Sequence, residues 1–94
     1  MKFVNYVKYK PERANTVRPK HREYTAKLMA EGKLVTAGPL SGGKGGLFIY
    51  ELPGIEAAQQ LFDEDPYKVE GAVESYELSP WEMVGVNLDL LQSE

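Results

Sequence analysis

The chain contains no cysteine in its 94 residues and only one histidine, His21. Disulfides and thiolate metal sites are therefore excluded, and a single imidazole leaves few ligands for a transition metal. Three consecutive acidic residues, Asp63, Glu64 and Asp65, would point to three different faces of a helical turn, which is a poor cage for calcium. We predict that the protein uses no metal and no cofactor.

Long apolar runs and a strong positive charge are also missing. No window approaches the roughly 20 apolar residues that a membrane-spanning helix needs, and the first residues do not resemble a secretory leader. Acidic residues outnumber basic ones by 14 to 11, which gives a formal net charge of -3 and no basic field for phosphate backbones. We therefore expect a cytoplasmic protein that binds neither membranes nor nucleic acid.

Hydrophobic spacing and turn residues predict six elements in the order β-α-β-β-α-β. The first helix is expected to begin at Pro19 and end at Gly32, and the second to end before Pro66. The predicted strands cover residues 2–9, 34–37, 47–50 and 72–78, the predicted helices cover 19–32 and 55–65, and Ser79 and Pro80 end the last strand.

This element order predicts an α+β, ferredoxin-like fold: a four-stranded antiparallel sheet with both helices on one face. The run 47–50 is apolar at every position, which is more than a sheet covered on one face requires. We therefore expect a homodimer or higher homo-oligomer joined through sheet faces. A bare sheet face that lines a ligand cavity would produce the same pattern.

The chain is short enough for one core, and we assign residues 1–81 to a single domain and 82–94 to a C-terminal arm or tail. Four apolar residues of the tail alternate with Gly85, Asn87 and Asp89, as they would in a half-buried strand; they are Val84, Val86, Leu88 and Leu90. A fifth strand and a partly ordered tail both fit this pattern.

His21 is expected on the inward stripe of the first helix, because Tyr24 and Leu28 follow it at helical spacing. Close to the helix start, the partial positive charge of the N-terminus would favour a neutral imidazole that can accept a proton. The residue is thus a candidate general base. A histidine that only packs and hydrogen-bonds in the core is the alternative.

Asp65 falls on the inward stripe at the predicted C-terminal end of the second helix, where a carboxylate needs a cation or a donor. Because the two helices are antiparallel, the start of the first and the end of the second share one end of the sheet. His21 and Asp65 are therefore expected to meet, with the carboxylate fixing the tautomer of the ring. Simple helix termination by Asp-Pro is the alternative.

Several residues around this pair are predicted to contact a small, anionic or aromatic substrate. They are Arg18, Tyr24, Gly38, Pro39, Ser41 and Lys44. The segment 38–44 has the spacing of a phosphate-binding loop up to its lysine, but Gly45 stands where Ser or Thr should hold magnesium and a strand follows instead of a helix. A hairpin loop, with a lid over the pocket as one option, is predicted instead.

The segments 18–24 (RPKHREY), 32–34 (GKL), 37–40 (AGPL) and 65–67 (DPY), followed by residues 80–81 (PW), resemble the YCII-related family. The resemblance covers most of residues 2 to 81. It implies the ferredoxin-like fold of the dimeric α/β-barrel superfamily, which includes muconolactone isomerases. It also implies a His/Asp active site, which maps onto His21 and Asp65.

These observations lead to a hypothesis of a cofactor-independent enzyme of lyase or isomerase type. His21 would move a proton, Asp65 would orient it and Arg18 would hold the substrate. A non-catalytic dimeric module that captures a metabolite in the same pocket is the alternative. Oxygen-dependent monooxygenation, known elsewhere in the superfamily, ranks third.

Overall fold

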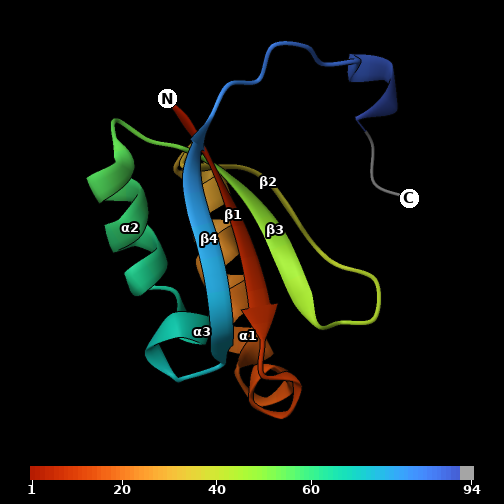
Figure 1. The fold of residues 1–94 in the computed structure, drawn as a ribbon, viewed down its shortest axis with the longest axis vertical. Coiled ribbons are helices and arrows are strands. Elements are labelled where there is room, and N and C mark those ends of the chain that lie inside the picture. Colours follow the sequence, from red (N-terminus) through yellow and green to blue (C-terminus); the bar gives the residue numbers. More distant parts are fainter. Residues whose placement is uncertain (92–94) are drawn as a thin grey trace.

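The computed structural model describes residues 1–91, which form one antiparallel sheet with helices packed on one side (Figure 1). The elements are β1 (Lys2–Tyr9), α1 (Pro11–Ala30), β2 (Leu34–Pro39), β3 (Gly45–Glu51), α2 (Ile55–Asp63), α3 (Pro66–Val69) and β4 (Val73–Trp81), followed by a 3-10 turn at Leu88–Leu90. The strand order β2-β3-β1-β4 confirms the predicted ferredoxin-like α+β fold.

The core lies between the sheet and the helices, and alternate residues of the central strands build it. In β1, Phe3, Asn5 and Val7 are fully buried, and they pair in register with Tyr50, Phe48 and Gly46 of β3. The helices contribute small and apolar side chains from one stripe each; these are Ala14, Val17 and Leu28 of α1 and Ala58, Leu61 and Phe62 of α2.

The predicted start of the first helix is wrong: α1 begins at Pro11, two turns before Pro19. Proline at the first helical position suits the helix, since its missing N–H would have no partner there. Pro19 lies on the exposed side, where water can solvate the carbonyl of Asn15 that loses its hydrogen bond. Consequently His21 lies in the middle of α1, and the expected effect of a helix N-terminus on its ring does not apply.

The predicted end of the second helix is also wrong. α2 stops at Asp63, Pro66 opens the short helix α3, and Asp65 is the N-cap of that helix. A carboxylate is favourable at an N-cap, so the repulsion expected at a helix C-terminus is absent. Asp63, one of the crowded acidic residues, lies on the surface and accepts a hydrogen bond from Lys68 at 2.8 Å.

Pro80 does not break the last strand, because β4 is an edge strand and continues to Trp81. Edge positions tolerate proline since one side of the strand needs no ladder hydrogen bonds. The predicted fifth strand is wrong as far as residue 91: residues 82–87 are irregular and lead away from the sheet (Figure 1). Val84 is 92% exposed. Residues 92–94 of the predicted tail lie outside the described part.

The sheet face opposite the helices carries large apolar side chains that nothing in residues 1–91 covers fully. Tyr6 of β1, Leu47 of β3 and Trp81 of β4 are 41%, 42% and 41% exposed. We call Tyr6, Leu47 and Trp81 the open-face cluster. None of the helices within residues 1–91 combines the length and apolarity needed to cross a membrane.

Candidate functional site

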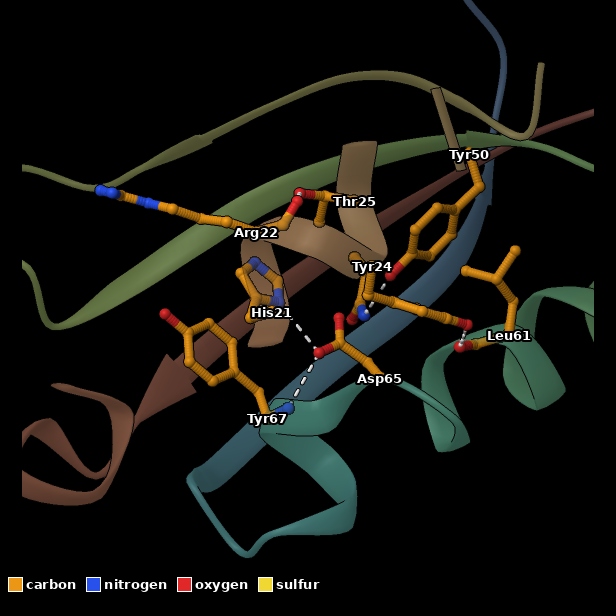
Figure 2. A network of polar contacts seen from close by, with 9 residues as sticks. His21, Arg22, Tyr24, Thr25, Tyr50, Leu61, Asp65 and Tyr67 are labelled. Carbon is orange, nitrogen blue, oxygen red and sulfur yellow. Dashed lines mark hydrogen bonds and ion pairs between the residues drawn. The ribbon is translucent and has the colours of Figure 1, made fainter. Parts of the chain in front are cut away.

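His21 and Asp65 meet at the end of the sheet where α3 begins (Figure 2). The ring nitrogen Nδ1 of His21 lies 2.9 Å from Oδ1 of Asp65. Both residues are buried, at 8% and 3% exposure, although they are separated by 44 positions in the sequence. The predicted juxtaposition of the two side chains is therefore present, while the local reasons for it differ from those expected.

The position of Asp65 is fixed by the start of α3. Its Oδ1 also accepts a hydrogen bond from the backbone N–H of Tyr67 at 2.9 Å, as N-cap side chains do (Figure 2). An ionised carboxylate can only accept, so with Asp65 ionised the shared hydrogen bond is donated by Nδ1 of His21. In the neutral ring, Nε2 is then the basic nitrogen, and no hydrogen-bond partner for it occurs within residues 1–91.

Two aromatic rings hold the imidazole plane. Tyr67 stacks on His21 with centroids 3.9 Å apart and planes inclined by 17°, and Phe48 meets the ring edge-on at 5.5 Å. Stacking and edge contacts of this kind restrict rotation of the imidazole. The Asp65 bond and the two rings thus define both the tautomer and the direction in which Nε2 points.

A cavity of about 400 Å³ opens beside His21, between α1 and the hairpin of β2 and β3. Arg18 and Arg22, one helical turn apart on α1, supply positive charge, and Tyr9, Phe48 and Tyr67 supply aromatic wall. The remaining lining residues are Thr25, Ala37, Gly38, Pro39, Leu40 and Gly43. The lining suits a small anionic or aromatic molecule.

Two buried tyrosines, Tyr9 and Tyr50, and the partly buried Tyr24 lie near the pair. Burial raises the pKa of the Tyr9 and Tyr50 hydroxyls far above the ordinary value, and it raises that of Tyr24 to about 12. The carboxylate of Asp65 acts in the same direction on all three. The Tyr50 hydroxyl accepts a hydrogen bond from Asn5 Nδ2 at 3.2 Å. These hydroxyls keep their protons at neutral pH and remain donors.

The residues predicted to bind substrate divide into two groups. Arg18, Gly38 and Pro39 line the cavity beside His21. Tyr24 does not: its hydroxyl donates to the carbonyl of Leu61, and its ring lines a different cavity between α1 and α2 (Figure 2).

Ser41 and Lys44 also lie elsewhere, in a depression of about 470 Å³ next to Tyr6 and Lys8. Lys44 is fixed through its backbone, whose carbonyl accepts from the N–H of Tyr9 at 2.9 Å. The strand that starts at Gly45 agrees with the rejection of a phosphate-binding loop. The hairpin reaches the main cavity through Leu40 and Gly43 instead.

Sequence reasoning missed four lining residues that shape the cavity: Tyr9, Arg22, Phe48 and Tyr67. A signal existed for Arg22, which follows Arg18 at a spacing of four and therefore lies on the same face of α1. Tyr67 adjoins Asp65 in sequence. Tyr9 and Phe48 carry no local signal, because only the register of the sheet brings them to the cavity. Within residues 1–91 no group of three or more His, Cys, Asp or Glu side chains is arranged so that it could hold a metal ion.

Solved structures of similar fold include enzymes. The chain superposes on 5-chloro-2-hydroxyhydroquinone dehydrochlorinase (TftG) from Burkholderia phenoliruptrix AC1100, solved with 2,5-dihydroxybenzoquinone, with a TM-score of 0.73 and 20% identity, covering 87% of this chain and 94% of that one. It also superposes on an antibiotic biosynthesis monooxygenase with a TM-score of 0.59 and 17% identity, covering 89% and 98%. Identities this low support the fold alone.

Sequence relatives match over nearly their full length. The proteins named YciI from Escherichia coli and Shigella flexneri are each 34% identical to this chain over 97 aligned positions, which cover 89% of this chain and 99% of theirs. Residues 1–82 match the YCII-related domain. The resemblance noted in the sequence is confirmed, and the chain belongs to the YCII-related domain family.

Proposed function

We propose that this protein is a cofactor-independent enzyme that moves a proton on a small, planar or anionic substrate, in a reaction of isomerase or lyase type. The observation that carries the proposal is the buried bond between His21 Nδ1 and Asp65 Oδ1 at 2.9 Å, beside a cavity lined with two arginines. A carboxylate that fixes Nδ1–H leaves Nε2 to act as the base.

The roles follow from the surroundings. His21 takes a proton from the substrate through Nε2 and returns it at another atom, while Asp65 stabilises the imidazolium formed in between. Arg18 and Arg22 bind the anionic part of the substrate, and the rings of Phe48 and Tyr67 form the wall for a flat one. The ligand named for TftG, 2,5-dihydroxybenzoquinone, is a flat and acidic compound small enough for a cavity of about 400 Å³. It supports the proposed type of substrate.

The first experiment is a screen for proton exchange in deuterated water by proton NMR, with cyclic ketones, lactones and hydroxyquinones as compounds. The wild-type protein is expected to exchange protons of at least one compound. His21→Ala should lower the rate by about a hundredfold or more, since general bases contribute 10²- to 10⁴-fold. Circular dichroism and urea unfolding check that the variant folds. Unchanged exchange in His21→Ala contradicts the proposal.

A second experiment tests the orienting role of Asp65 without a substrate. The ¹⁵N shifts of the single histidine report its tautomer, and the wild-type ring is expected to carry its proton on Nδ1. Asp65→Ala removes the oxygen that accepts from Nδ1, so the preference for the proton on Nδ1 should be lost. An unchanged tautomer in this variant argues against orientation by Asp65.

A non-catalytic module that captures a metabolite is the rival from a different class. The same cavity, with Arg18 and Arg22 on one wall, would serve binding alone. Tight binding of a compound without exchange or turnover, unaffected by the tautomer of His21, favours this rival.

The open-face cluster motivates a proposal about assembly: two copies associate through their sheet faces. Tyr6, Leu47 and Trp81 expose about two-fifths of their surface on one side of the sheet, and a partner would remove them from water. The assembly is tested by sedimentation, as described in the Discussion.

A further inference from the structure

Tyr9 ends β1 with its ring turned into the cavity beside His21. Its ring lies 4.6 Å from that of Tyr67, which in turn stacks on His21 at 3.9 Å. Tyr9 and His21 therefore flank the same tyrosine and line the same space. A small molecule in the cavity can contact both side chains.

The hydroxyl of Tyr9 has no hydrogen-bond partner within residues 1–91, although the side chain is 7% exposed. It is not sealed in the core: in that part of the chain the only fully enclosed side-chain polar atom without a partner is Oδ1 of Asn5. The Tyr9 hydroxyl is consequently not fully enclosed, and Tyr9 lines both the cavity beside His21 and the depression next to Tyr6 and Lys8. The hydroxyls of Tyr24, Tyr50 and Tyr76 have protein partners, whereas that of Tyr67, which lines the same cavity, has none within residues 1–91 either.

The backbone of β3 makes room for this hydroxyl. A Cβ atom on Gly46 would lie 2.4 Å from the Tyr9 hydroxyl oxygen, and 3.2 and 3.3 Å from two ring carbons of Phe48. No side chain larger than hydrogen fits at residue 46 while Tyr9 stays in place. Gly46 thus sets the position of an unpaired donor next to the ring that contacts His21 edge-on.

We infer that Tyr9 is a further catalytic residue, whose hydroxyl donates a hydrogen bond to a substrate oxygen, and that the substrate is a carbonyl compound passing through an enolate or phenolate. The inference rests on the proposed function of His21 as the base. Burial raises the pKa of Tyr9, so its hydroxyl stays protonated and available as a donor, although Arg18 nearby acts in the opposite direction.

The proposed step balances without a co-reactant. Nε2 of His21 removes a proton from the carbon next to the carbonyl, the C–H electron pair becomes a C=C bond, and the carbonyl π pair moves onto oxygen. Tyr9 stabilises that oxygen with its O–H, while Arg18 or Arg22 holds another anionic group. The substrate carries a C=C bond between its β and γ carbons, so the intermediate is a dienolate. The imidazolium returns the proton at the γ carbon, where the π pair of the β,γ bond forms the new C–H bond; the α-carbon π pair moves between the α and β carbons, and the C=O bond forms again. The net change is a shift of one proton and one double bond.

The test uses 4-nitrophenolate as a probe for the oxygen anion, titrated into the full-length protein and followed by its absorbance. Tyr9→Phe should weaken binding by roughly ten- to a hundredfold, since hydrogen bonds to charged groups have this effect. Nitrobenzene, which lacks the phenolate oxygen, should bind the wild type and Tyr9→Phe equally. Tyr6→Phe is the matched control, because residue 6 faces the other side of β1 and should leave probe binding unchanged.

Gly46→Ala provides an independent variant, since its methyl group displaces the Tyr9 hydroxyl. It should weaken 4-nitrophenolate binding as Tyr9→Phe does, whereas Gly54→Ala, with nothing within 4 Å of the added methyl, should not. In a double-mutant cycle, Gly46→Ala should shift the urea midpoint less in the Tyr9→Phe background, where the clashing oxygen is gone.

The outcomes separate this inference from the proposed function. Equal binding of 4-nitrophenolate by wild type and Tyr9→Phe, or no binding by wild type, overturns the role of Tyr9 even if His21 proves essential for turnover. Weaker binding in Tyr9→Phe supports the inference as a property of the site, and it does so whether or not the exchange experiment on His21→Ala succeeds.

Discussion

The two faces of the sheet differ in what completes them. On the helix side, Phe48 is 4% exposed and packs against His21; its neighbour Leu47 points to the other side and is 42% exposed. A strand presents successive residues to opposite faces, so adjacent positions can have unrelated roles. The candidate site lies on the covered side of the sheet, between α1, α3 and the β2–β3 hairpin, whereas the open face has large apolar side chains and no cover within residues 1–91.

The difference teaches how the site obtains its rigidity. His21, Asp65, Tyr67 and Phe48 come from three separate elements, and each is fixed by a contact with another of the four. Removing a side chain on this face should therefore lower both the stability and the activity of the protein. Removing one on the open face should affect only the association of two copies.

The largest effect is expected from Phe48→Ala. Removing a buried aromatic ring costs about 3–5 kcal/mol of unfolding free energy. Leu47→Ala is the matched control and should cost less than about 1 kcal/mol, because the side chain is partly solvated. Urea unfolding at low protein concentration measures both. Equal losses of unfolding free energy in the two variants would mean that the two faces are equally well packed, which contradicts the difference described above.

Asp65→Ala comes next, with an expected loss of about 2–4 kcal/mol. It removes the N-cap of α3 and leaves the buried Nδ1–H of His21 without its acceptor. Asp63→Ala, two residues away, breaks an exposed ion pair with Lys68 and an exposed hydrogen bond from Gln59, and should cost about 1 kcal/mol or less. The pair of variants compares a buried with an exposed carboxylate in the same segment, and comparable unfolding free energies would show that the buried bond adds no stability.

Leu47→Glu tests the open face. If sheet faces join two copies, a charge in the open-face cluster should shift the sedimentation coefficient from dimer to monomer while the far-ultraviolet circular dichroism stays the same. Val69→Glu, also at an exposed apolar position but on α3, is the control and should leave the assembly unaltered. A wild-type protein that sediments as a monomer at all concentrations excludes the proposed dimer.

The smallest effect is expected at Glu51, which accepts hydrogen bonds from Lys2 and from the terminal ammonium. These contacts lower its pKa from 4.5 to about 2. A lowered pKa contributes stability above pH 4.5, and that contribution is lost as the pH falls from 4.5 to 2. Glu51→Gln should therefore melt slightly below wild type at pH 7 and match it near pH 2. A difference in melting temperature that persists at pH 2 would show that the charge of Glu51 is not its cause.

Tertiary structure corrected the local arguments while leaving the pairing intact. From sequence, Pro19 marked a helix start and Asp65 a helix end. The first assignment wrongly placed His21 near a helix N-terminus, and the second wrongly placed Asp65 at a helix C-terminus. The pairing survived because it depended on the antiparallel order of the helices and not on those helix ends. Local signals for proline are ambiguous, since proline is favoured in a first helical turn and is also tolerated, at a cost in stability, at an exposed interior position such as residue 19.

The sequence by itself determined the fold and the pair. The order of apolar segments leaves one compact topology, and that topology brings residues 21 and 65 to one end of the sheet. Only the tertiary structure decided which other residues share the site. Tyr9, Phe48 and Arg22 entered the cavity, and Tyr24, Ser41 and Lys44 did not, because strand register and helix rotation set side-chain directions. Strand register and helix rotation depend on packing across the whole core, which no local sequence pattern encodes.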